Sequence, residues 1–140
     1  MMMVISGRHI LFSSLILFAP LMVMAVEYRW PPLTYRHVYV KNNLDNGTIL
    51  TLHCKDKDHD LGVQKLNYQE EFKFQFKPNF LGNRLYFCGL TWDGNLHWFV
   101  VYNDRRDLTF CKDLHWSINK DKPCLFNCDT QKYDCEYNYN

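Results

Sequence analysis

Hydrophobic and polar positions alternate with a period of two residues along much of the chain. The clearest case is residues 72–77, where three phenylalanines alternate with lysine, glutamine and lysine. Residues 38–40 and 50–54 show the same alternation. Because successive side chains of a strand point to opposite faces, each segment is predicted to be a strand with one face in a core and the other in water.

Two further segments, residues 85–90 and 96–102, are apolar at nearly every position. This pattern predicts strands that are buried on both faces at the centre of a sheet. Trp116 and Ile118 supply another pair of inward-facing positions.

Turn residues separate these segments. Asn46-Gly47 lies between the segments at residues 38–40 and 50–54 and predicts a tight hairpin. Pro78-Asn79 ends the phenylalanine segment, and Asp93-Gly94-Asn95 predicts a second hairpin. Short strands spaced by about ten residues indicate an all-β sandwich or barrel. We therefore predict an all-β fold, a small antiparallel β-sandwich of about seven to eight strands linked by disulfides.

The N-terminal segment has the pattern of a secretory signal peptide over residues 1–25. Arg8 precedes an apolar stretch over residues 10–24, and Val23-Met24-Ala25 supplies the small and aliphatic residues of a cleavage site. The alternative is a signal anchor, but the apolar stretch is short and Pro20 interrupts it. We expect cleavage after Ala25, a secreted extracellular protein, and an extended lead-in over residues 26–36.

Charge and hydropathy limit the partners of the mature chain. The full chain has 16 basic and 15 acidic side chains, and removal of Arg8 balances them. Without a strong field we expect no nucleic-acid partner. No second apolar stretch is long enough to span a bilayer, so we expect no direct membrane insertion after signal cleavage.

All six cysteines follow the signal peptide. An even number in a short secreted chain indicates disulfides, although the sequence alone does not choose among the possible pairings. Residues 127–140 form a polar tail whose two cysteines are close enough in sequence to bond locally. The disulfide candidates are Cys54, Cys88, Cys111, Cys124, Cys128 and Cys135.

Few residues have the pattern of a catalytic or metal site. The alternating aspartates of residues 56–60 are similar to the start of a calcium loop, but Asn67 stands where a bidentate Glu is required. Ser117, the only serine after residue 25, has no flanking glycines. We predict no metal, no cofactor and no enzymatic activity. The alternative is a small secreted hydrolase or ribonuclease using His97 or His115 as acid or base.

Asn46-Gly47-Thr48 is a sequon for N-glycosylation at a predicted exposed turn. If the chain is secreted it meets the glycosylation machinery, so we predict a glycan on Asn46.

The segment Val38 to Leu44 and the segment Leu50 to Gly62, with its His53-Cys54-Lys55 block, resemble the plant self-incompatibility S-protein homologue family. Further landmarks follow in that family's order over about residues 37–125: Phe72-Lys73-Phe74, Leu85-Tyr86-Phe87-Cys88, Trp98, Tyr102, Arg106-Asp107, Cys111, Trp116-Ser117-Ile118 and Cys124.

The resemblance implies a secreted antiparallel β-sandwich over residues 37–126 that acts as a signalling ligand through an unidentified cell-surface receptor or membrane protein. It also implies the pairs Cys88–Cys111 and Cys54–Cys124, with Cys128–Cys135 as an added bridge in the tail. The alternative is that Cys124 pairs within the tail and Cys54 with another cysteine. Many relatives carry a further cysteine where this chain has Leu114.

Two charged segments between strands are the candidate recognition loops, because loops carry specificity on a rigid scaffold. The first comprises Lys55, Asp56, Lys57, Asp58, His59 and Asp60, followed by Leu61-Gly62; the second comprises Asn103, Asp104, Arg105, Arg106 and Asp107.

Overall fold

The computed structural model describes residues 34–78 and 81–140. The predicted signal peptide and most of the lead-in lie outside these residues. The described chain forms nine strands and one helical turn: β1 (Arg36–Asn42), β2 (Leu50–Lys55), β3 (Asp60–Leu66), β4 (Glu71–Phe76), β5 (Leu85–Trp92), β6 (Asn95–Asn103), α2 (Asp104–Asp107), β7 (Asp113–Ile118), β8 (Pro123–Asn127) and β9 (Lys132–Asp134).

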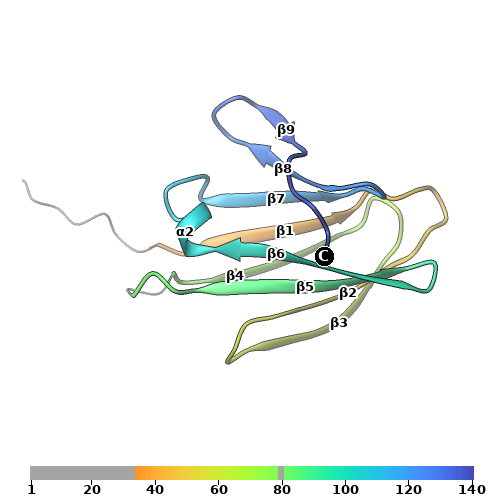
Figure 1. The fold of residues 1–140 in the computed structure, drawn as a ribbon, viewed down its shortest axis with the longest axis horizontal. Coiled ribbons are helices and arrows are strands. Elements are labelled where there is room, and N and C mark those ends of the chain that lie inside the picture. The colour runs from red at the N-terminus through yellow and green to blue at the C-terminus, as the bar shows by residue number, and fades with distance from the viewer. Residues whose placement is uncertain (1–33, 79–80) are drawn as a thin grey trace, which may run out of the picture. The chain divides into compact units, whose positions relative to one another are not determined.

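The strands form two sheets (Figure 1). One has the order β4-β1-β7-β8-β9 and the other β3-β2-β5-β6. Neighbouring strands are antiparallel except β1 and β7, which are parallel. The predicted all-β, disulfide-linked sandwich is confirmed. It has more strands than expected because β3, β8 and β9 carry weaker alternation.

The core lies between the sheets and follows the period-two pattern. Val38 and Val40 of β1 are buried opposite Phe74 and Phe72 of β4, of which Phe74 is buried and Phe72 partly so. The indole Nε1 of Trp116 in β7 donates a 2.9 Å hydrogen bond to the carbonyl oxygen of Val101. Since Val101 belongs to β6, this buried bond joins the two sheets.

The two predicted hairpin turns have different outcomes. Asp93 and Gly94 have φ of 51° and 75° and join the antiparallel strands β5 and β6, so this hairpin is confirmed. The hairpin predicted at Asn46-Gly47 is wrong, because β1 and β2 belong to different sheets. Gly47 does have a positive φ of 92°, but it bends a crossover between layers.

The prediction of a central strand is correct for β5 and wrong for β6. β5 lies between β2 and β6, whereas β6 is the last strand of the four-stranded sheet. The outer edge of β6 meets the C-terminal end of the chain, where Asn140 and Trp98 exchange backbone hydrogen bonds of 2.8 and 3.3 Å.

The segment predicted as a polar tail is an ordered part of the fold. After β9, Tyr137 packs edge-on against Trp116 and Tyr139 packs against Trp92 and Phe99. The Tyr139 hydroxyl donates a 2.7 Å hydrogen bond to the carbonyl oxygen of Asn119. Residues 136–140, which we name the C-terminal strap, therefore connect the five-stranded sheet to the edge of the four-stranded sheet.

The disulfides are Cys54–Cys88, Cys111–Cys128 and Cys124–Cys135. The pairing implied by the resemblance is wrong, and the alternative, with Cys124 bonded within the tail, is correct. Cys54 and Cys88 face each other directly in β2 and β5, with Cα atoms 4.0 Å apart, so neither is placed to reach a cysteine of the other sheet. Leu114 is fully buried in the core.

Among the described residues, no helix is both long and apolar enough to cross a bilayer.

Candidate functional site

The loop after β6 has a mainly structural role. The carboxylate of Asp107 is 1% exposed and accepts hydrogen bonds of 2.7 and 2.8 Å from Nε and Nη2 of Arg106. It also accepts one of 2.8 Å from the backbone N–H of Asn103. The guanidinium of Arg106 donates to the carbonyl oxygen of Val100 and lies 5.4 Å from the ring centre of Trp116. The prediction that Asp107 contributes to a recognition loop is therefore wrong.

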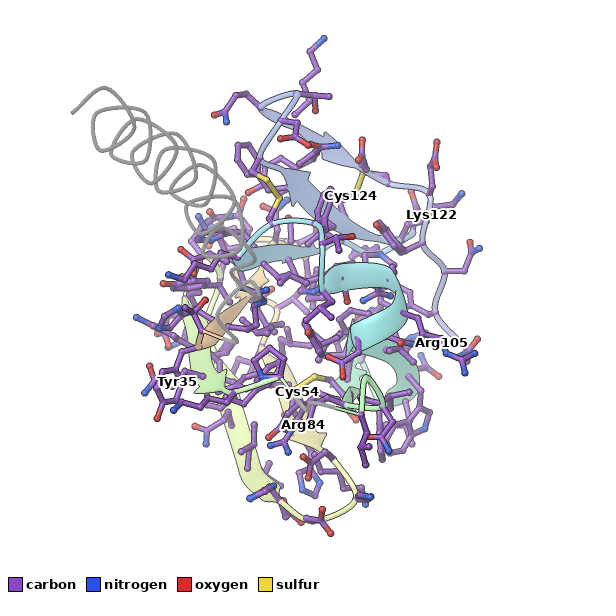
Figure 2. The ribbon with its side chains drawn as sticks, turned by 90° about the vertical axis from the view of Figure 1, so that its left-hand side faces the viewer. Tyr35, Cys54, Arg84, Arg105, Lys122 and Cys124 are labelled. Atoms are coloured by element: carbon purple, nitrogen blue, oxygen red, sulfur yellow. A yellow bond between two sulfur atoms is a disulfide. The ribbon has the colours of Figure 1, made fainter. Side chains whose placement is uncertain are left out.

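Asp104 is equally committed to the fold. Its carboxylate accepts hydrogen bonds of 2.7 Å from the hydroxyl of Tyr102 and from the backbone N–H of Arg84. Burial, together with this hydrogen bond, raises the pKa of Tyr102 well above its ordinary value. In the described loop, Arg105 is the residue that projects into solvent from α2 (Figure 2).

The tip of the β2–β3 hairpin combines one buried carboxylate with exposed neighbours. Asp56 is buried, and its Oδ1 accepts backbone hydrogen bonds from Asp58 and His59. Burial alone would raise the pKa of Asp56, but these N–H donors, the His59 side chain and Arg84 lower it overall. Asp56 is therefore wrong as a contact residue, whereas Lys57, Asp58, His59 and Asp60 are exposed.

Strand β3 begins at Asp60, so the part of the candidate loop from Asp60 to Gly62 is already strand. The carboxylate of Asp60 accepts a 2.8 Å bond from the backbone N–H of Gly62 and is paired with Nε2 of His53. These two contacts lower the pKa of Asp60.

Arg84 connects the two candidate loops, a role that the sequence analysis missed. Its backbone N–H binds Asp104, and its Nη2 lies 3.4 Å from Oδ2 of Asp56. The guanidinium also lies over the rings of Phe76 and Tyr86, at 5.7 and 5.5 Å from their centres. Figure 2 looks onto the end of the molecule that carries α2, and Arg84 is labelled there. No local pattern around Arg84 indicates this role, because its partners lie far away in the sequence.

A hollow of about 240 Å³ lies beside the hairpin tip. Its lining combines charged groups of both signs with two hydrophobic side chains: Asp56, Lys57, Asp58, Asn83, Arg84, Leu85 and Phe87. Phe87 also borders a second hollow, formed by residues 55–60. The hairpin tip and the outer face of β5 therefore form one continuous surface.

That surface extends across the whole outer face of the four-stranded sheet in three cross-strand rows. Directly opposed residues of antiparallel strands share a face, so each row can be read from the strand register. The rows are Asp60-Lys55-Phe87-Val100, Val63-His53-Gly89-Trp98 and Lys65-Thr51-Thr91-Leu96. We name these twelve residues the Trp98 face.

Trp98 is held flat against the sheet at the edge of this face. A Cβ atom at Gly89 would lie 3.2 Å from two carbons of the indole six-membered ring, so only glycine accommodates the ring at this distance. Trp98 also contacts Phe87, with ring centres 5.8 Å apart. Trp98 is 37% exposed, Leu96 55% and Val63 60%. The face therefore presents large hydrophobic groups to solvent between charged side chains.

The histidines of the catalytic alternative are not brought together. His97 pairs in register with the buried Leu90 and stacks on Trp92 with ring centres 4.1 Å apart, so it faces the inside of the sandwich. His115 alternates with the buried residues Leu114 and Trp116 of β7, so it points to the outer face of the five-stranded sheet, where it stacks on Tyr39. Within residues 34–78 and 81–140, no group of three His, Cys, Asp or Glu side chains is placed to hold a metal ion.

Comparison with known proteins agrees with the arrangement of strands and landmark residues. The family model for plant self-incompatibility protein S1 matches residues 37–139. The chain belongs to this family.

Several relatives in Arabidopsis thaliana are similar over most of their length. S-protein homolog 5 is 38% identical over 94 residues, which is 67% of this chain and 73% of that protein. S-protein homolog 29 is 33% identical over 135 residues, or 96% of this chain and 98% of the relative. The S-protein homologue family suggested by the sequence is confirmed.

A solved structure of SPH, a self-incompatibility protein homologue, has the same fold. The TM-score is 0.56 at 20% identity, and the alignment covers 77% of this chain and 96% of the other. That family is described as small, highly stable, secreted proteins from plants.

Proposed function

We propose that this chain is secreted and acts as a recognition protein, binding a protein on a cell surface through the Trp98 face and the hairpin tip. The observation that carries the proposal is the set of exposed hydrophobic side chains on the outer face of the four-stranded sheet, with Val63 on the edge strand β3 and Leu96 and Trp98 on the edge strand β6. An ordinary outward face of a solvated sheet is polar, so Trp98, Leu96 and Val63 require another explanation.

The composition of the face is that of a protein-binding surface. Trp98 and Phe87 contact each other on β6 and β5, and aromatic residues dominate the binding energy of protein interfaces. Lys55 lies beside Phe87, and Asp60 and Lys65 lie on the edge strand β3, where charged groups guide association and exclude wrong partners. The flat seat on Gly89 holds the Trp98 ring in place before binding, which reduces the entropy lost on association.

Recognition is favoured over catalysis because His97 faces the inside of the sandwich, whereas His115 lies on the outer face of the five-stranded sheet. Balanced charge gives no support for a nucleic-acid partner, and family membership supports secretion. We also propose that residues 1–25 are the signal for secretion and are removed.

The experiment is equilibrium binding of the fluorescently labelled mature protein to plant cells, competed by an excess of unlabelled protein. Saturable binding is expected. The double variant Lys57→Ala/Asp58→Ala changes exposed groups at the hairpin tip without changing net charge, and we expect it to weaken binding by roughly tenfold, equivalent to about 1.4 kcal/mol.

The matched control is Asp129→Ala/Lys132→Ala, which removes the same two charges from the exposed β8–β9 hairpin. We expect this control to bind like the wild type. Binding that does not saturate, together with turnover of RNA that is lost in His97→Ala or His115→Ala, would contradict the proposal and favour the enzyme.

A further inference from the structure

The crossover from β1 to β2 and the turn from β3 to β4 form a second exposed surface, at the end of β2 and β3 opposite the hairpin tip. A hollow of about 350 Å³ lies between them, lined by Asn46, Gly47, Thr48, Ile49, Asn67 and Tyr68. Two large side chains in it are open to solvent, Ile49 at 52% and Tyr68 at 40%. The hollow thus has a sequon asparagine on one wall and an exposed aromatic ring on the other.

The two walls are held together by one buried side chain. Asn42 is fully buried, and its Nδ2 donates hydrogen bonds of 2.8 Å to the carbonyl oxygen of Thr48 and 3.0 Å to that of Leu66. Its backbone oxygen accepts a further bond of 2.8 Å from Gln69. Because Asn42 binds both segments, the distance between the sequon and Tyr68 is fixed by the core.

We infer that Asn46 carries an N-linked glycan whose first sugars rest on Tyr68 and Ile49. Asn46 is exposed, and Gly47 with its φ of 92° bends the chain directly after it. The C–H face of a sugar ring is apolar and its hydroxyls are polar, which suits a tyrosine ring with a hydroxyl at its end. This inference rests on the proposed secretion, and it adds that the glycan occupies the hollow.

The chemistry requires a lipid-pyrophosphate-linked oligosaccharide as co-reactant. The Nδ2 atom of Asn46 forms a bond to the anomeric carbon of the first N-acetylglucosamine and loses one proton to the medium. The bond from that carbon to the pyrophosphate oxygen breaks, and the lipid pyrophosphate leaves with the electron pair. No oxidant or reductant is needed.

The position of the glycan leaves the hairpin tip open. Asn46 precedes the first residue of β2, whereas the hairpin tip follows its last residue. A strand of this length spans roughly 17–20 Å. A glycan at Asn46 therefore lies at the other end of the sheet from Lys57 and Asp58.

The test uses the full chain secreted by a eukaryotic host. Mass spectrometry of the intact protein is expected to show a glycan in the wild type and in Thr48→Ser, which keeps the sequon. Thr48→Ala is expected to lose it. An unmodified Asn46 in the wild type, in protein exported from the same cells, would overturn the inference.

A thermal comparison of three backgrounds, each with and without the glycan, tests the contact with Tyr68. Loss of the glycan through Thr48→Ala is expected to lower Tm by about 3–5 °C in the wild-type background and by less than about 1 °C in the Tyr68→Ala background. Tyr133→Ala, another exposed tyrosine, is the control background and should retain the full shift. An equal shift in all three backgrounds would overturn the contact.

If Tyr68→Ala is not exported, Ile49→Ser provides the same comparison from the other wall of the hollow.

Binding of Thr48→Ala to cells separates this inference from the proposed function. We expect Thr48→Ala to bind like the wild type, so an absent glycan and an absent partner give different results.

Discussion

Buried carboxylates organise the loops around the Trp98 face. Asp56, Asp104 and Asp107 each accept at least one backbone N–H, and each contacts Arg84 or Arg106. Such hydrogen bonds offset the cost of removing a carboxylate from water. These aspartates set the shape of the surface, while their exposed neighbours are available for contact.

Asp56→Asn tests this role through its dependence on pH. The folded-state pKa of Asp56 is lowered, so its contribution to stability is complete above the unfolded value near 4 and is lost as the pH falls below it. We expect the variant to lose about 1–2 kcal/mol in free energy of unfolding at pH 7 and much less at about pH 2.5.

The measurement is urea unfolding at both pH values, with the exposed Asp58→Asn as the control. A destabilisation of Asp56→Asn that stays the same at both pH values would show that the carboxylate charge has no such role.

At the scale of strands, the period-two pattern located the core correctly but not the position of β6. An apolar segment can be buried on both faces or can display hydrophobic groups on a binding surface, and periodicity does not distinguish the two. Trp98 and Leu96 are exposed on β6, on the surface that we propose binds a partner. Gly89 leaves a gap in the outward-facing side chains of β5. The strand register explains this gap, because it places the ring of Trp98 against Gly89.

Loop roles were the least predictable part of the site. Charge and position between strands correctly indicated exposure for Lys57, Asp58 and Arg105. They failed for Asp104 and Asp107, whose donors are supplied by Arg84, Asn103 and Arg106 in the folded chain. Contacts of this kind depend on tertiary structure and have no periodic signal in the sequence.

The C-terminal strap is the element whose stability role is easiest to test. Tyr139→Ala removes a ring packed on Trp92 and Phe99 and a hydrogen bond to Asn119, and we expect a loss of about 2–3 kcal/mol in free energy of unfolding. Tyr139→Phe retains the packing and should lose only about 1 kcal/mol. Denaturant unfolding measures both.

Alkaline pH gives an independent check on the strap. Burial raises the pKa of Tyr139, so its contribution to stability is complete below the unfolded value of about 10 and is lost as the pH rises beyond it. Tyr139→Phe should therefore be less sensitive to high pH than the wild type. Equal sensitivity would indicate that the strap is not buried in solution.

At the scale of the whole molecule, none of the three disulfides in the described part of the chain joins one sheet to the other. Cys54–Cys88 lies within the four-stranded sheet, and the other two bridges hold the segments around β7, β8 and β9. The two layers are held by side-chain packing, by the Trp116 bond to Val101 and by the C-terminal strap.

Replacement of Cys124 and Cys135 by serine tests the tail bridge. It closes a loop with a sequence separation of 11, and we expect its removal to cost about 3 kcal/mol in free energy of unfolding. Peptide mapping without reduction is expected to show Cys54–Cys88 and Cys111–Cys128 intact in this variant. A Cys54–Cys124 peptide in the wild type would contradict the observed pairing.

The most direct test of recognition by the Trp98 face is the dissociation constant of Trp98→Ala for the plant cell surface. Trp98 is part of the surface rather than the core, so the variant should remain folded, as circular dichroism can verify. We predict binding at least roughly tenfold weaker than the wild type, with Tyr133→Ala on the other sheet unchanged. An unchanged dissociation constant for folded Trp98→Ala would contradict the account.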